Sequence, residues 1–148
     1  MNILVSACLL GVACRYDGGG ALRPGMERLM EIHHLIPVCP EIMGGLATPR
    51  TPAERRDEKV ITKTGKDVTD EYRRGACEVL RLARLFGCSA AVLKERSPSC
   101  GKGRIYDGTF TGVLTDGSGV CAELLEKNGI KVYGESQLER LLEELEPI

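Results

Sequence analysis

The sequence has no tryptophan, few aromatic residues and no long apolar run. Among its 148 residues Trp is absent, and Phe, Tyr and Trp together make up only 4%. Proteins that bind single-stranded nucleic acid stack bases on several aromatic side chains, so this scarcity argues against such a platform. A transmembrane helix needs about 18 or more consecutive apolar residues, and no such run is present. We therefore expect neither a base-stacking surface nor a membrane span.

An excess of charge of one sign is also missing. The 20 basic and 21 acidic residues leave a net charge of -1, which provides no electrostatic footprint for DNA or for a membrane surface. A small nucleotide or a local contact with RNA stays compatible with this balance. Residues 1–5 lack a basic segment and are too short and strand-like for a signal peptide. We expect a cytoplasmic protein, and the length predicts one domain over residues 1–148.

Cysteine, by contrast, is abundant. The chain has seven cysteines, an odd number, and in a cytosolic chain this favours a metal site, a cluster or a reactive thiol over disulfides. No two cysteines form a C-x-x-C pair, so neither a zinc ribbon nor a thioredoxin motif is predicted. Cys77, Cys88 and Cys121 fall inside predicted helices or at the start of a strand. We interpret these three as small buried hydrophobic residues.

Hydrophobic periodicity predicts four strands that alternate with four helices. The expected strands are residues 2–6, 35–38, 89–94 and 130–133, and the expected helices are 24–33, 70–86, 118–128 and 135–146. A surface hairpin is expected where residues 58–62 and a short run around 67–68 flank Thr64-Gly65-Lys66. The alternation predicts an α/β fold, a three-layer sandwich with a mainly parallel sheet. Its expected architecture is Rossmann- or flavodoxin-like, with strand order near 2-1-3-4.

Three cysteines follow three of the predicted strands. Cys8 comes after the first strand, Cys39 after the second, and Cys100 after a short polar loop beyond the third. Ligands of open parallel sheets bind beyond the carboxyl ends of the strands, where the strand order reverses, so we expect these thiols at one crevice. Three thiolates can hold a soft metal ion or an iron–sulfur cluster and leave one position open for chemistry. Cys14 stays unassigned, either a spare thiol or an oxidation partner of Cys8.

Two other interpretations compete with this one. A strand followed by Cys8, a loop and Arg15 resembles the phosphate-binding loop of low-molecular-weight tyrosine phosphatases and arsenate reductases, in which a cysteine thiolate is the nucleophile. Six residues separate Cys8 from Arg15, one more than in that loop, and the glycines 18–20 that follow give no helix start. The other alternative is a non-catalytic module that binds a metal or a cluster, with Cys14 as a fourth ligand.

Three blocks of the sequence resemble one known family. The blocks are residues 5–18 with Cys14-Arg15-Tyr16-Asp17-Gly18, residues 39–54 with Cys39-Pro40-Glu41, and residues 93–101 with Ser97-Pro98-Ser99-Cys100-Gly101. In this order they are similar to a bacterial family long called a domain of unknown function, whose characterised members are thiouracil desulfidases. The resemblance extends over almost the whole chain.

The resemblance implies an oxygen-sensitive 4Fe–4S cluster held by Cys8, Cys39 and Cys100, with one iron open. That iron would bind the sulfur of a thio-nucleobase such as 2-thiouracil as a Lewis acid, and water would replace the sulfur to give uracil and hydrogen sulfide. By the same resemblance Glu41 and Ser97 are the catalytic residues that handle protons.

Further residues of the three blocks are expected at the substrate. Ser99, Asp17 and Arg50 are predicted to bind it, with surface ion pairs as the alternative for Asp17 and Arg50. The alternative to a catalytic role for Glu41 is a structural one, in which its side chain caps the helix or turn that follows Pro40. The natural substrate stays open between a free base, a nucleoside and a modified RNA. The oligomeric state stays open as well, a homodimer included.

Overall fold

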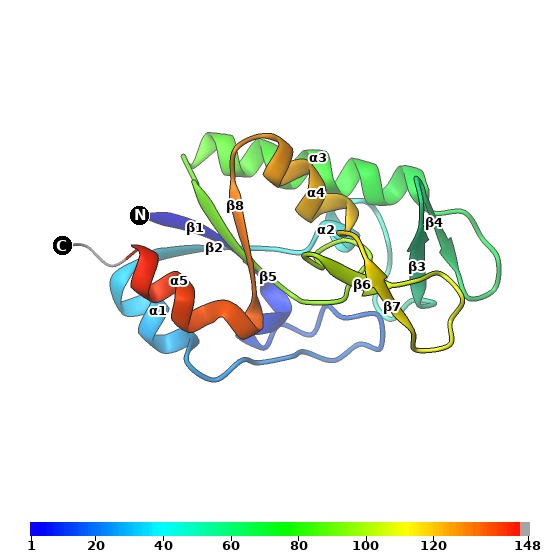
Figure 1. Cartoon of the computed structure of the whole chain (residues 1–148), viewed down its shortest axis with the longest axis horizontal. Helices are drawn as coiled ribbons and strands as arrows, with labels where there is room; N and C mark the ends of the chain where they lie inside the picture. Colours follow the sequence, from blue (N-terminus) through cyan, green and yellow to red (C-terminus); the bar gives the residue numbers. More distant parts are fainter. Residues whose placement is uncertain (146–148) are drawn as a thin grey trace.

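A four-stranded parallel sheet forms the centre of the computed structural model, which describes residues 1–145. Its strands are β1 (Asn2–Ser6), β2 (His34–Val38), β5 (Ala90–Leu93) and β8 (Lys131–Gly134). They lie in the order β2-β1-β5-β8 (Figure 1). The predicted order of the four strands is therefore confirmed, and with it the mainly parallel α/β class.

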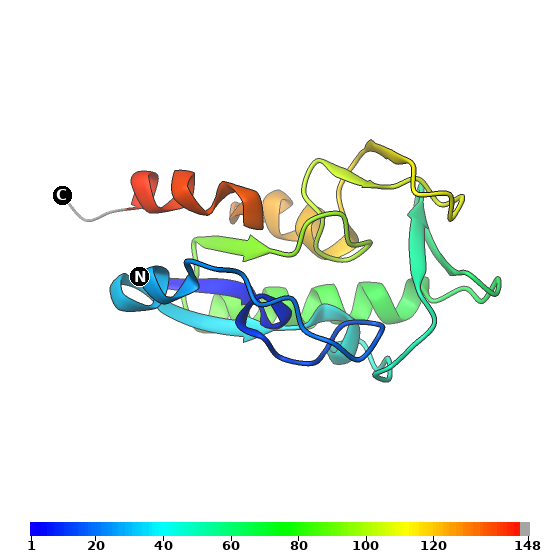
Figure 2. The ribbon, with the colours of Figure 1, turned by 90° about the horizontal axis from the view of Figure 1, so that it is seen from below.

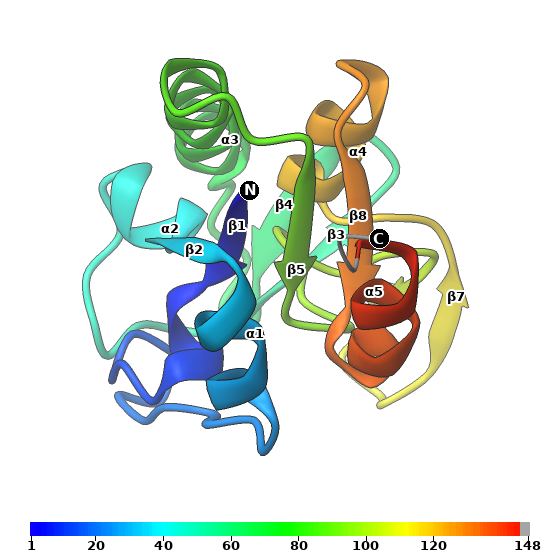
Figure 3. The ribbon, with the colours of Figure 1, turned by 90° about the vertical axis from the view of Figure 1, so that its left-hand side faces the viewer.

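The central strands are buried on both faces, which explains their continuous apolar sequences. Side chains alternate along a strand, so successive residues of β1 enter different cores. Leu4 packs in the core under α3 (Thr69–Leu85) and α4 (Val120–Lys127). Ile3 and Val5 pack in the core under α1 (Met26–Ile32) and α5 (Leu138–Leu145). Helices α3 and α4 thus cover one face of the sheet and α1 and α5 the other, as Figure 3 shows, and the predicted three layers are confirmed.

The longest helix, α3, corrects one expectation. Its residues Ala76, Val79, Leu80 and Ala83 are buried at helical spacing. Cys77, predicted to be buried, is exposed, because it follows Ala76 by about 100° around the helix. Cys88 and Cys121 are buried as predicted. The last predicted helix, 135–146, begins as a 3₁₀ turn, η2 (Glu135–Gln137), before α5, and residue 146 lies outside the described residues.

Two antiparallel hairpins lie beyond the carboxyl ends of the parallel strands (Figure 2). They are β3 (Ala53–Arg56) with β4 (Lys59–Thr62), and β6 (Arg104–Tyr106) with β7 (Leu114–Asp116). The predicted hairpin around Thr64-Gly65-Lys66 is present as a short antiparallel bridge, but the prediction missed the longer partner of β4, which is β3, joined to it by a tight turn in which Asp57 has a φ of 54°. The run around 67–68 also lies antiparallel to β4, with a bridge between Ile61 and Asp67 and backbone hydrogen bonds from Thr62 N–H to the Lys66 carbonyl oxygen at 2.8 Å and from Val68 N–H to the Val60 carbonyl oxygen at 2.9 Å. The β6–β7 hairpin was not predicted.

Two short helices place the residues that follow β1 and β2. The 3₁₀ helix η1 (Ala7–Leu10) follows β1, and α2 (Pro40–Met43) follows β2. Helix α2 lies very close to α3 at Gly75. A Cβ added at Gly75 would stand 1.7 Å from the carbonyl oxygen of Pro40, so this approach requires a residue without a side chain. Arg15 starts no helix, and the next helix begins at Met26, so a strand–loop–helix of the phosphatase type is absent here.

Within residues 1–145, no helix combines the length and the apolar character that crossing a membrane requires.

Candidate functional site

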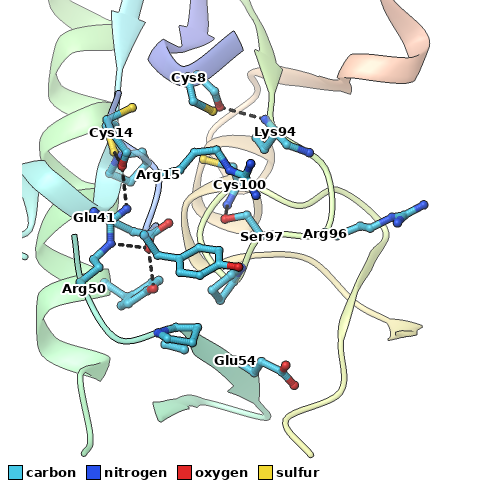
Figure 4. Close-up of a pocket in the computed structure, with 18 of the residues that line it drawn as sticks. Cys8, Cys14, Arg15, Glu41, Arg50, Glu54, Lys94, Arg96, Ser97 and Cys100 are labelled. Atoms are coloured by element: carbon cyan, nitrogen blue, oxygen red, sulfur yellow. Dashed lines mark hydrogen bonds and ion pairs between the residues drawn. The ribbon is translucent and has the colours of Figure 1, made fainter. Parts of the chain in front are cut away.

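A cavity of about 580 Å³ lies at the carboxyl edge of the sheet (Figure 4). Segments after β1, β2 and β5 contribute Cys8, Cys39 and Cys100 to its wall. The two hairpins contribute Glu54 and Phe110. The three cysteines, 31 and 61 residues apart in sequence, therefore line one space, as the strand order predicts.

Three thiols of this cavity, Cys8, Cys14 and Cys100, are buried, Cys39 is half-buried, and the four influence one another. Burial, followed by the neighbouring Cys39, raises the pKa of Cys8 to about 11. Burial also raises the pKa of Cys14 to about 12, with Cys39 and Cys8 adding to the effect. The Cys100 thiol has its pKa raised to about 12 by burial, although hydrogen bonds from Ser6 and Ser99 act in the opposite direction. A bound cation would reverse this preference, because thiolates are the form that metals bind.

The donor set fits an iron–sulfur cluster better than a single metal ion. Among residues 1–145, no three His, Cys, Asp or Glu side chains lie close enough together to hold one ion. A cubane cluster is wider than an ion and takes one thiolate at each of several irons, so its protein ligands stand further apart. The cavity offers several thiols and no histidine, and thiolates are the ligands that such clusters prefer.

Glu41, in the first turn of α2, is held by three hydrogen bonds. Its Oε1 accepts one from Arg50 Nε at 3.1 Å and one from the Tyr72 hydroxyl at 2.8 Å. Its Oε2 accepts one from the Ser99 hydroxyl at 2.9 Å. Burial raises the pKa of Tyr72, which keeps this hydroxyl a donor. Each carboxylate oxygen can accept two hydrogen bonds, so Oε1 is filled and Oε2 keeps one position open.

Ser97 and Ser99 form a directed chain of hydrogen bonds that ends at Glu41. Ser97 Oγ accepts the backbone N–H groups of Ser99 and Cys100, each at 3.1 Å, and lies 2.9 Å from Ser99 Oγ. A hydroxyl has one hydrogen. When Ser99 donates its hydrogen to Glu41, the hydrogen between the two serines must therefore come from Ser97. The direction is Ser97 to Ser99 to Glu41.

The two serines differ in their access to the cavity. Ser97 lines it, whereas Ser99 is 1% exposed and does not. Ser99 also lies 3.6 Å from Cys100 Sγ, a second acceptor for its hydrogen. Ser99, predicted to bind substrate, thus lies behind the wall and connects Ser97, Glu41 and Cys100.

Arg50 lines the cavity, but its guanidinium is already engaged. Besides Glu41 it donates to the carbonyl oxygens of Ala47 at 3.1 Å and Cys14 at 2.9 Å, and to Thr48 Oγ1 at 3.0 Å. The backbone N–H of Arg50 also donates to the carbonyl oxygen of Tyr16 at 2.8 Å. Arg50 therefore fastens the segment after β1 to Glu41, and few of its N–H groups remain for a substrate.

Asp17, also predicted to bind substrate, does not line the cavity. Its carboxylate accepts the N–H of Gly19 at 2.9 Å and lies 3.9 Å from Arg15 Nη1. These contacts hold the glycine-rich turn together, since Asp side chains commonly close such turns on their own backbone. The neighbouring residues Arg15 and Tyr16 do line the cavity.

Several lining residues carried no recognisable signal in the sequence. Tyr72 belongs to the periodic pattern of α3, and nothing local links it to Glu41. Phe110 and Tyr106 belong to the hairpin that was not predicted. Lys94, whose Nζ lies 2.6 Å from Glu135 Oε1, stands in the third sequence block, which could have drawn attention to it.

A parallel α/β sheet that gathers cysteine thiols and a hydrogen-bonded carboxylate around one cavity has the features of a metal- or cluster-dependent enzyme. The family model described as 2-thiouracil desulfurase matches residues 3–137. The chain belongs to this family.

Two individual proteins are similar over nearly the full length. The uncharacterized protein YbbK of Bacillus subtilis (strain 168) is 43% identical over 150 aligned positions, which cover 95% of this chain and 99% of YbbK. The solved structure of the [4Fe-4S]-dependent thiouracil desulfidase TudS has a TM-score of 0.92 and 47% identity, and the match covers 97% of each chain. The family inferred from the three sequence blocks and the fold inferred from the alternation of strands and helices are thus confirmed. The roles of the individual residues stay predictions.

Proposed function

We propose that this protein is a 4Fe–4S-dependent desulfidase that removes sulfur from a thiouracil-type nucleobase. The family and the similarity to TudS support this class of reaction. The observation that supports it most directly is the cavity in which Cys8, Cys39 and Cys100 occur together with Glu41. The reaction exchanges a thiocarbonyl and water for a carbonyl and hydrogen sulfide, and no net electron transfer is needed.

We assign the cluster to Cys8, Cys39 and Cys100, which leaves one iron without a protein ligand. When bound, the cluster supplies a soft Lewis acid for the thiocarbonyl sulfur. Ser6 contributes a hydrogen bond to Cys100, and such a bond to a ligand sulfur orients it and tunes the metal centre. Ser99 can do the same only when its hydrogen turns from Glu41 to the Cys100 sulfur. Arg50 keeps the segment of Cys14 next to Glu41.

Glu41 and Ser97 carry the proton transfers in this proposal. Oε2 of Glu41 has the open acceptor position, so it is the oxygen that takes a proton from the water that replaces sulfur. Ser97 lines the cavity and is connected to Glu41 through Ser99. In this orientation the chain carries a proton from the cavity side at Ser97 through Ser99 to Glu41, and a proton received at Glu41 returns by the same route once both serine hydroxyls have rotated.

We also place the protein in the bacterial cytoplasm, as one domain over residues 1–148. The similar protein of Bacillus subtilis and the seven free cysteines support this, because thiols stay reduced in the cytosol. Exposure to air is expected to destroy the cluster and to abolish activity.

Anaerobic reconstitution with iron and sulfide tests the proposal. The holoprotein should show the visible absorption of an iron–sulfur cluster and convert 2-thiouracil to uracil with equimolar sulfide. Iron that never binds, or a fully loaded protein without turnover, would contradict it.

The non-catalytic alternative has one observation in its favour, the Cys14 thiol, which is 3% exposed and lines the same cavity. With Cys14 as fourth ligand no iron would be open for substrate. In a Cys14→Ala variant the desulfidase should keep its iron and its activity, as should the matched control Cys77→Ala on the outer face of α3. Loss of iron from Cys14→Ala alone would favour the non-catalytic module.

A further inference from the structure

Aromatic side chains are scarce in this chain, yet most of them gather at the cavity. The chain has four Tyr and two Phe. Tyr16, Tyr72, Tyr106 and Phe110 line the cavity, and the cores under the helices are built almost entirely from aliphatic residues. Flat aromatic surfaces in a cavity suit a flat ring as ligand, because rings pack face to face or edge to face.

Phe110 differs from the three tyrosines in its chemistry and backbone. The Tyr72 hydroxyl is already bound to Glu41, and Tyr16 is 42% exposed next to Arg15. Phe110 has no polar group, and its φ is 58°, in the left-handed region. A bulky residue adopts this conformation at a cost and keeps it only when its surroundings impose it.

Glu54 imposes that conformation from the neighbouring hairpin. Its Oε1 accepts the N–H groups of Gly108 at 3.0 Å and Phe110 at 3.1 Å. The N–H of Asp107 also donates to the carbonyl oxygen of Val113 at 3.0 Å and closes the loop. The segment that carries Phe110 is therefore tied to β3, and in Figure 4 Glu54 lies at the end of the cavity opposite Cys8.

We propose that Phe110 is the residue on which the planar heteroaromatic ring of the substrate stacks, and that Glu54 positions it. The substrate then spans the cavity, with its sulfur toward the thiols after β1, β2 and β5 and its ring against the β6–β7 hairpin. The identity of this ring as a thio-nucleobase rests on the function proposed above. The placement of the ring against Phe110 rests on the aromatic lining of the cavity and on the hydrogen bonds from Phe110 and Gly108 to Glu54.

The stacking contact predicts a particular kinetic pattern. Phe110 touches the ring body and no atom that changes bonds, so it binds substrate and transition state equally. Loss of such a contact raises KM and leaves kcat nearly unchanged. Stacking of a base on an aromatic side chain typically changes affinity by about tenfold or more.

A pair of variants separates the ring from the loop conformation. Asn adopts the left-handed region readily, so Phe110→Asn keeps the backbone and removes the ring, whereas Phe110→Tyr keeps the ring. In the anaerobic holoenzyme we expect KM for 2-thiouracil to rise about tenfold in Phe110→Asn and to stay near the wild-type value in Phe110→Tyr. Equal KM values in all three proteins would overturn the proposal.

A second measurement does not depend on turnover. The chain contains no Trp, so Phe110→Trp introduces a single fluorescent reporter at the proposed stacking position. Titration of the holoprotein with uracil should change its emission saturably. Phe86→Trp, at an exposed position outside the cavity, should not respond. An unresponsive Trp at position 110 would contradict the proposal even if the Asn variant failed to fold.

The two proposals fail in distinguishable ways. Wild-type holoenzyme that binds uracil at Phe110→Trp but never desulfurates 2-thiouracil would refute the desulfidase and keep the ring site. Wild-type turnover with an unchanged KM in Phe110→Asn would keep the desulfidase and refute the ring site.

Discussion

Cys88 and Cys100 stand on either side of β5 and are almost equally buried, at 7% and 5% exposure. For Cys88 burial alone accounts for its raised pKa. For Cys100 burial raises the pKa, hydrogen bonds from the Ser6 and Ser99 hydroxyls lower it, and the Glu41 carboxylate and the Cys8 thiol raise it further. Burial is thus common to both thiols. What distinguishes the thiol after the strand is the set of polar groups that the other strands bring to the same edge.

Removal of a cavity thiol should give the largest effect and would test this comparison directly. Cys100→Ala should lose the cluster and all turnover, because an iron left without its thiolate is released. Cys88→Ala, the matched change at the other end of the sheet, should retain both. Iron and sulfide analysis of the reconstituted proteins measures the difference. Equal iron content in the two variants would show that the thiol at the carboxyl edge of the sheet has no special role.

Neutralising Glu41 should have the next largest effect. Glu41→Gln keeps an acceptor oxygen for its neighbours but loses the basic carboxylate, so kcat should fall about a hundredfold to a thousandfold. Iron content should not change, since Glu41 is no thiolate. The control is Glu139→Gln, an exposed carboxylate on α5. A kcat within threefold of the wild-type value would exclude Glu41 as the base.

The reactivity of the free thiols should also separate the two regions. In the metal-free protein at pH 8, the raised pKa of Cys8, about 11, leaves about a hundredfold less thiolate than at an ordinary thiol. Exposed Cys77 should therefore react with iodoacetamide long before Cys8, and the Cys8 rate should rise as pH approaches 11. Peptide mass spectrometry over time measures both rates. Comparable rates at pH 8 would contradict the buried arrangement.

Removing one hydroxyl should give the smallest effect. Tyr72→Phe keeps the ring of a buried residue and frees one position on Glu41 Oε1, so Glu41 loses part of its orientation. We expect kcat to fall about tenfold with little change in KM or iron content. Tyr133→Phe is the matched control, since its hydroxyl also donates to a carboxylate, Glu144, outside the cavity. Equal kinetics in the two variants would show that the bond to Glu41 is unimportant.

Local patterns predicted the sheet and the helices well, and the hairpins poorly. Buried strands and amphipathic helices can be recognised from the hydrophobic periodicity of a short stretch of sequence. The β3–β4 hairpin depends on distant anchors instead: Arg55 Nη1 contacts the carbonyl oxygen of Ser118 at 2.7 Å and Glu123 Oε2 at 2.6 Å. Contacts between residues so far apart in the sequence cannot be predicted from a short stretch of it.

The sequence by itself determined the strand order, the family and the expectation that Cys8, Cys39 and Cys100 meet, because strand ends of a parallel sheet share one edge. Only the tertiary structure decided how Glu41 is held. Its donors Tyr72 and Ser99 lie 31 and 58 residues away. The missing side chain of Gly75 lets α2 approach α3 closely enough for the Tyr72 bond. Packing at this distance depends on the whole fold, so no single stretch of sequence specifies it.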